Sequence, residues 1–144
     1  MRQLRVLLVD DHEGFLNAAQ RQLRNLPWVS VVGRALNGLE AVRLTEQLTP
    51  DAVLMDLAMP EMGGLQATRL IKAQTKPPFV VIASHFDDPQ HREHAASAGA
   101  DGFVTKSSPP EVLVAALRRV AAGEQRVLSP DIAAAPAQPA AQAP

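Results

Sequence analysis

Short apolar runs alternate with amphipathic stretches along most of the chain. The runs are nearly continuous rather than alternating with polar residues, a pattern typical of strands that are buried on both faces of a sheet. Each run predicts a strand, and the five runs are residues 4–9, 29–35, 52–55, 79–83 and 102–104.

Helical patterns occupy the stretches between these runs. In the first, apolar residues recur at helical spacing until Pro27, and the third extends over about residues 65–71. The fourth, from about Pro89 to Ala98, offers only alanines to a core, so we expect it to be the least stable element. The expected inward-facing residues of the first and third helices are Phe15, Ala18, Ala19, Leu23, Leu26, Leu65, Thr68, Leu70 and Ile71.

Two helix starts carry explicit capping signals. Asn37 with Glu40 three residues later forms a capping box for the second helix. Ser108 with Glu111, separated by two prolines, predicts the start of the fifth helix, which ends at Gly123.

Five strand–helix units with short connections predict an α/β fold with a doubly wound parallel sheet and right-handed crossovers. The common strand order of such a flavodoxin-like (βα)5 fold is 2-1-3-4-5, which opens a crevice at the carboxyl ends of strands 1 and 3. We expect residues 1–125 to form this domain and residues 126–144, rich in Ala, Pro and Gln, to be a disordered tail or linker.

Composition narrows the possible functions. Lys and Arg total 14 against 15 Asp and Glu, so no basic excess favours nucleic acid or an anionic membrane. The chain has no Cys, which excludes thiolate chemistry and disulfides and favours a cytoplasmic location. No stretch approaches the roughly 20 apolar residues of a membrane span.

Polar residues follow four of the predicted strands. Asp10 and Asp11 follow the first strand and Asp56 follows the third, while Ser84 and Lys106 follow the fourth and fifth. Because these ends meet at one edge of the sheet, the residues should converge on the crevice. Three carboxylates need a compensating cation, and an all-oxygen set suits Mg²⁺. Asp56 is the best-placed nucleophile for phosphorus, so the pattern predicts a phosphoryl-transfer site.

Four segments in this order resemble the bacterial response-regulator receiver domain, and the resemblance extends over residues 4–123. The segments are residues 9–12, 55–64, 83–84 and 103–106. Residues 103–111, 120–124 and 128–130 further resemble the NarL/FixJ type, whose receivers usually precede a LuxR-type helix-turn-helix.

The resemblance implies that Asp56 accepts a phosphoryl group from a histidine kinase, a phosphotransfer protein or a small acyl phosphate. It also implies that Asp11 and Asp56 bind Mg²⁺ directly, that Asp10 acts mainly through water, and that the backbone carbonyl of Ala58 completes the protein ligands. The chain would then be a signalling switch rather than an enzyme.

The resemblance assigns the phosphoryl oxygens to Lys106 and Ser84. Ser84 and Phe103 would form a two-state switch that moves the face made by the fourth helix, fifth strand and fifth helix. Ala58 and Phe86 occupy the positions that tune dephosphorylation in the family. Because Ala58 cannot orient a water molecule and Phe86 could exclude one, we expect slow self-dephosphorylation.

Several functions are compatible with these observations. A transcription regulator would carry its effector domain outside this chain, because the 21 residues after Gly123 are too few for a helix-turn-helix that binds DNA directly. A stand-alone receiver would act as an adaptor or phosphoryl shuttle, and phosphorylation could drive homodimer formation in either case. A haloacid-dehalogenase-like phosphatase would use the same strand-end aspartate as nucleophile, and an unphosphorylated interaction module would use none of this chemistry.

The remaining polar and aromatic groups favour structural roles. Asp87 and Asp88 with His91 and His94 have metal-like spacing, but helix capping explains the acidic pair better. We expect loop positioning by His12, simple exposure of His85, core packing of Trp28, and helix-terminal charge compensation by Arg118, Arg119 and Arg126.

Overall fold

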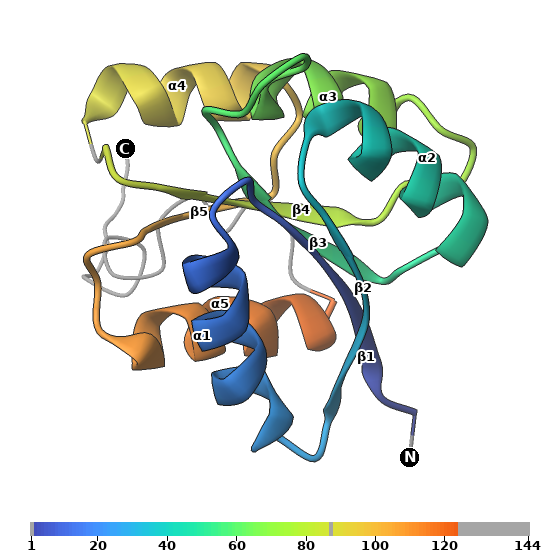
Figure 1. Ribbon diagram of the computed structural model, residues 1–144, viewed down its shortest axis with the longest axis vertical. Helices are drawn as coiled ribbons and strands as arrows, with labels where there is room; N and C mark the ends of the chain where they lie inside the picture. Colours follow the sequence, from blue (N-terminus) through green and yellow to red (C-terminus); the bar gives the residue numbers. More distant parts are fainter. Residues whose placement is uncertain (1, 87, 124–144) are drawn as a thin grey trace.

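A five-stranded parallel sheet forms the centre of the computed structural model, which describes residues 2–86 and 88–123. The strand order is β2-β1-β3-β4-β5, which confirms the predicted topology (Figure 1). The predicted tail, residues 126–144, lies outside the described residues. The elements are β1 (Leu4–Val9), α1 (Glu13–Arg24), β2 (Val29–Ala35), α2 (Gly38–Leu48), β3 (Ala52–Asp56), α3 (Gly64–Lys72), β4 (Phe79–Ser84), α4 (Pro89–Ser97), β5 (Gly102–Thr105) and α5 (Pro110–Ala121).

The helices divide between the two faces of the sheet. Helices α1 and α5 cover one face, and α2, α3 and α4 cover the other (Figure 1). Successive strand residues point to opposite faces, so Val6 and Leu8 join the core under α1 and α5, while Leu7 and Val9 join the other core. All four side chains are buried, which explains why the strand is apolar at every position.

One capping prediction is confirmed and the other is wrong. The Asn37 side chain accepts a hydrogen bond from the Glu40 backbone N–H at 2.9 Å and caps α2. Helix α5 begins at Pro110 with Pro109 as its N-cap, not with Ser108. The Ser108 hydroxyl instead bonds the Thr105 hydroxyl at 2.5 Å, so it is engaged with the end of β5 rather than with the helix.

The inward faces of two helices also differ from the prediction. Leu70 is 44% exposed, because Ala67, Thr68 and Ile71 form the buried side of α3. Ala18 in α1 is exposed as well, since the helix turns Leu16 into the core in its place. Both helices still bury one stripe at the expected spacing, shifted around the helix axis.

Helix α4 has the smallest apolar anchor among the described helices. Its nine residues bury only Ala95, and Asp88 caps its N-terminus by accepting from the His91 backbone N–H at 2.8 Å. The expected capping role of Asp88 is therefore confirmed, while Asp87 lies outside the described residues. A helix with so little buried apolar surface gains little from tertiary packing.

Trp28 packs against the core on the α1 and α5 side, as expected. The guanidinium carbon of Arg118 in α5 lies 4.8 Å from the centre of its ring, within cation–π range. The contact ties the start of β2 to the last turns of α5. Within the described residues, every helix is too short or too polar to cross a membrane.

Candidate functional site

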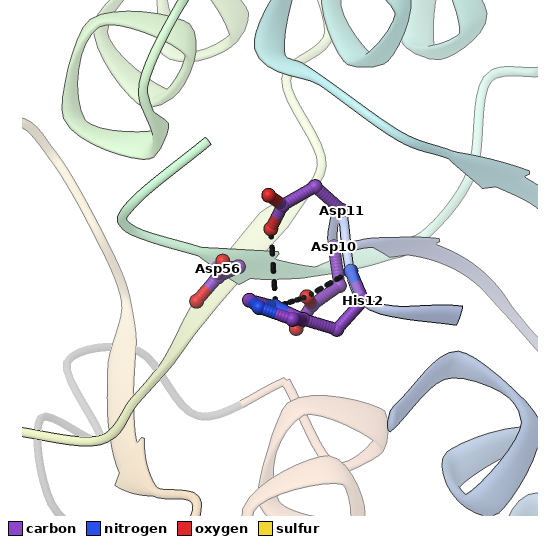
Figure 2. A group of neighbouring side chains, drawn as sticks. All are labelled: Asp10, Asp11, His12 and Asp56. Carbon is purple, nitrogen blue, oxygen red and sulfur yellow. Dashed lines mark hydrogen bonds and ion pairs between the residues drawn. The ribbon is translucent and has the colours of Figure 1, made fainter. Parts of the chain in front are cut away.

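The carboxyl ends of the strands bring the predicted polar residues together. Asp56 is the last residue of β3 and Ser84 the last of β4, while Asp10, Asp11 and Lys106 follow β1 and β5 directly. One ligand atom from each of Asp10, Asp11, His12 and Asp56 lies within 4.8 Å of the others. Figure 2 shows these four side chains at the same edge of the sheet, with dashed lines from His12 to Asp10 and Asp11.

Lys106 places a buried positive charge against two of these carboxylates. Its Nζ lies 2.5 Å from Asp10 Oδ2 and 3.0 Å from Asp56 Oδ1. Only 3% of the Lys106 side chain is exposed, and the ammonium also lies 4.4 Å from the centre of the Phe15 ring. Lys106 therefore neutralises part of the charge of the acidic cluster.

The pKa of Asp56 is raised above its ordinary value. Burial of the carboxyl is the largest cause, and the charges of Asp10 and Asp11 add to it. The hydrogen bond and charge of Lys106 lower the pKa but do not cancel the increase. An ionised Asp56 is thus an electrostatically disfavoured group, which a second cation would stabilise.

His12 links the two carboxylates that follow β1. Its backbone N–H donates to Asp10 Oδ1 at 2.9 Å, and its Nδ1 lies 3.1 Å from Asp10 Oδ1 and 3.2 Å from Asp11 Oδ1 (Figure 2). The residue is also the N-cap of α1. This geometry supports the expected role of His12 in positioning the loop.

The donor set fits a hard divalent ion. Oδ2 of Asp10 and Oδ1 of Asp56 contact Lys106, which leaves the second oxygen of Asp56 and the carboxylate of the more exposed Asp11 for a metal ion. Oxygen ligands with a net negative charge and room for water are what Mg²⁺ prefers. The contribution of the Ala58 carbonyl stays a prediction.

Ser84 and Phe103 lie on the neighbouring strands β4 and β5. The Ser84 hydroxyl oxygen accepts a hydrogen bond from the Phe86 backbone N–H at 3.0 Å, and the Ser84 carbonyl accepts from the Lys106 N–H at 2.7 Å. The Phe103 side chain is fully buried in the core under α2, α3 and α4. Its ring is therefore already turned inward in this structure.

A cavity of about 370 Å³ opens next to Asp56, with largely apolar walls. Beside this cavity, Gly64 at the start of α3 packs closely on the end of β3, because a Cβ there would lie 2.0 Å from the Asp56 carbonyl oxygen. The cavity is lined by Asp56, Leu57, Ala58, Gly63, Leu65, Gln66, Ser84, His85, Phe86, His91 and His94.

Some residues lie at the site although no motif or spacing in the sequence predicts it. Helical spacing predicts that Phe15 lies on the core stripe of α1, but it does not show that the ring lies beside Lys106. The sequence does not predict the stack of Phe86 on His91 either, because ring orientation depends on the loop between β4 and α4. His85 is exposed, as expected, and Arg126 lies outside the described residues.

Comparisons with known proteins agree on one family. Residues 6–118 match the response regulator receiver domain. The chain is 41% identical over 131 residues to the response regulator GacA of Pseudomonas aeruginosa, covering 90% of this chain and 60% of that protein. It is 35% identical over 132 residues to the nitrate/nitrite response regulator protein NarL of Escherichia coli, covering 90% and 61%.

A solved structure gives the same result. The two-component response regulator of the LuxR family from Aurantimonas sp. SI85-9A1 superposes with a TM-score of 0.84 at 39% identity. The superposition covers 92% of this chain and 94% of that one. The chain spans about 60% of the length of the curated relatives it matches.

Proposed function

The chain belongs to the response regulator receiver family, of the NarL/FixJ type, and from this we propose that it is a phosphorylation-controlled switch of a two-component system with Asp56 as the phosphoacceptor. The observation that carries the proposal is the position of Asp56 at the cluster of Asp10, Asp11 and Lys106. A cognate histidine kinase or phosphotransfer protein supplies the phosphoryl group, and we place the reaction in the cytoplasm.

In the proposed reaction an oxygen of Asp56 attacks the phosphorus of a phosphohistidine. The new P–O bond forms as the P–N bond breaks, and the electron pair stays on the imidazole nitrogen of the donor, which takes a proton from solvent. Bound Mg²⁺ supplies charge neutralisation for the phosphoryl oxygens. Asp11 and Asp56 would hold the ion directly, together with the Ala58 carbonyl, and Asp10 would act mainly through water.

The new phosphoryl group changes the partners of two residues at the site. It adds a charge of about −1.5 to −2 beside Asp56, which attracts the Lys106 ammonium away from Asp10. The oxygen of the Ser84 hydroxyl accepts a hydrogen bond from the Phe86 N–H, and its proton can turn toward a phosphoryl oxygen. Both shifts pull on the ends of β4 and β5, so we propose that the face of α4, β5 and α5 changes conformation.

Phosphorylation of the chain by a small acyl phosphate tests this proposal. With acetyl phosphate and Mg²⁺, the intact chain should gain the mass of one phosphoryl group, and it should not in EDTA. The Asp56→Asn variant should gain none, whereas modification elsewhere would overturn the assignment. A haloacid-dehalogenase-like phosphatase would instead release phosphate over many turnovers, which a phosphate-release assay distinguishes.

We propose that the output is control of transcription through an effector domain outside this chain, and a stand-alone adaptor or phosphoryl shuttle is the second candidate. The greater length of GacA and NarL supports the first. Light scattering with Mg²⁺ and beryllofluoride distinguishes them. A beryllofluoride-dependent shift to dimer that Asp56→Asn abolishes favours pairing of effector domains. Binding of beryllofluoride without a change in mass favours the adaptor.

A further inference from the structure

Two stacked rings form one wall of the cavity beside Asp56. Phe86 and His91 both line this cavity, their ring centres are 5.0 Å apart, and their planes differ by 14°. Phe86 is 59% exposed, so the core does not hold its side chain. The stack on His91 is therefore a main restraint on the position of the Phe86 ring.

His91 is in turn fixed by Asp88. The Asp88 carboxylate accepts from the His91 backbone N–H at 2.8 Å, and its two oxygens lie 2.8 Å and 2.7 Å from the His91 Nδ1. These hydrogen bonds hold the pKa of Asp88 below its ordinary value, so the acceptor stays ionised at neutral pH. One carboxylate thus fixes both the first turn of α4 and the plane of the imidazole.

Ser84 holds the backbone of Phe86, whose ring contacts His91. The backbone N–H of Phe86 donates to the Ser84 hydroxyl oxygen at 3.0 Å. The backbone of Phe86 is therefore tied to the end of β4, and its ring is tied to the start of α4. Together these contacts hold the Phe86 ring at the cavity that Asp56 shares.

We infer that His91 is a positioning residue, which holds the Phe86 ring across the path of water to phosphorylated Asp56 and so prolongs the acyl phosphate. The inference rests on the proposed function. In hydrolysis, a water oxygen bonds to phosphorus as the bond to the Asp56 oxygen breaks. The electron pair returns to the carboxylate, a water proton passes to solvent, and inorganic phosphate leaves.

The geometry of hydrolysis explains why the position of the Phe86 ring affects the rate. Attack in line with the breaking bond brings water from the side of the phosphoryl group opposite to Asp56. Ala58, which lines the same cavity, has only a methyl group and cannot orient this water. The side chains around the cavity therefore act on the rate through the access of water to the phosphoryl group. The stack of Phe86 on His91 controls this access.

The test measures loss of the phosphoryl group after the chain is labelled with acetyl phosphate and Mg²⁺ and the donor is removed. His91→Ala should speed the loss about two- to tenfold, the factor by which one aromatic contact changes the population of a packed ring. His91→Phe keeps a flat ring at this position and should restore the slow rate. Phe86→Ala should match His91→Ala, and the double variant should be no faster than Phe86→Ala.

Gln90→Ala is the matched control, because it shortens an exposed side chain at the neighbouring position of the same helix, which does not line the cavity. Its rate of loss should equal that of the unmodified chain. An unchanged rate in His91→Ala, or a slower rate as expected if His91 served as a base for water, would overturn the inference while leaving Asp56 as the phosphoacceptor. Failure of the unmodified chain to take up phosphate would reject the proposed function and this inference with it.

Discussion

Replacing Asp56 by Asn should stabilise the metal-free protein at neutral pH. Asp56 is 5% exposed at the end of β3, where its ionised carboxyl faces two other carboxylates. Asn has nearly the same shape and keeps an oxygen that can accept from the Lys106 ammonium. The substitution therefore removes a buried charge without opening a cavity.

The size of the gain follows from three opposing contributions. At 3.0 Å, the Lys106 Nζ attracts Asp56 Oδ1 by about 5.5 kcal/mol at an effective dielectric constant of about 20. Asp10, with an oxygen within 4.8 Å, repels Asp56 by about 3.5 kcal/mol on the same scale, and the more exposed Asp11, which solvent screens, adds a smaller repulsion. Burial adds a penalty of several kcal/mol for the ion, which leaves the ionised form disfavoured by on the order of 2 kcal/mol. The Asn variant should gain about that much.

The gain should depend on pH with a definite sign. The folded pKa of Asp56 is raised above 3.8, so the folded protein binds the proton more tightly than the unfolded chain does. The contribution of Asp56 to the stability of the unmodified protein should fall as pH rises from 3.8 through the folded pKa, by up to about 1.4 kcal/mol per pH unit. Below this window Asp56 is protonated in both states, and the advantage of the Asn variant disappears.

Urea denaturation in EDTA between about pH 3 and pH 8 measures this difference. Asp11→Asn is the control, because Asp11 is more exposed and its replacement should give a smaller gain. Saturating Mg²⁺ should reverse the order, since binding to the folded state stabilises only the chain that keeps the full ligand charge. An Asn variant that is no more stable than the unmodified chain at pH 7 in EDTA would refute the electrostatic reasoning.

Two further substitutions test how the site is built. Lys106→Met should lower the free energy of unfolding by about 3 to 5 kcal/mol, because Asp10 loses its buried cation, and adding Asp10→Asn should restore part of the loss in urea denaturation. Gly64→Ala should cost about 2 kcal/mol or more, because its Cβ would overlap the Asp56 carbonyl oxygen. Gly14→Ala, at a position with open space, should leave the midpoint unchanged or raise it slightly.

The fold and the convergence of site residues could be predicted because both depend on the order of elements along the chain. Continuous apolar runs identify buried parallel strands, and the topology of a doubly wound sheet then fixes which strand ends are neighbours. Asp56 and Lys106 could be placed at one edge on that basis alone. Their roles in phosphoryl transfer stay predictions that the proposed labelling experiment tests.

The details that could not be predicted depend on how side chains rotate and pack. The Ser108 capping signal competes with a hydroxyl on β5, and sequence spacing does not reveal that competitor. Leu70 is exposed because α3 is turned about its axis, which depends on packing against the sheet and α2. The direct contact of Lys106 with Asp10 joins residues 96 positions apart, beyond what local patterns report.

The contact between Trp28 and Arg118 gives the chain a built-in optical probe. The sequence contains one Trp and no Tyr, so its near-ultraviolet emission comes almost entirely from this indole. The Trp28 indole directly precedes β2, and the Arg118 guanidinium of α5 lies over its ring. A change in emission on adding beryllofluoride would thus register a displacement of α5 rather than occupancy of the acidic cluster. Stopped-flow fluorescence could time the arrival of the signal at that helix without any attached dye.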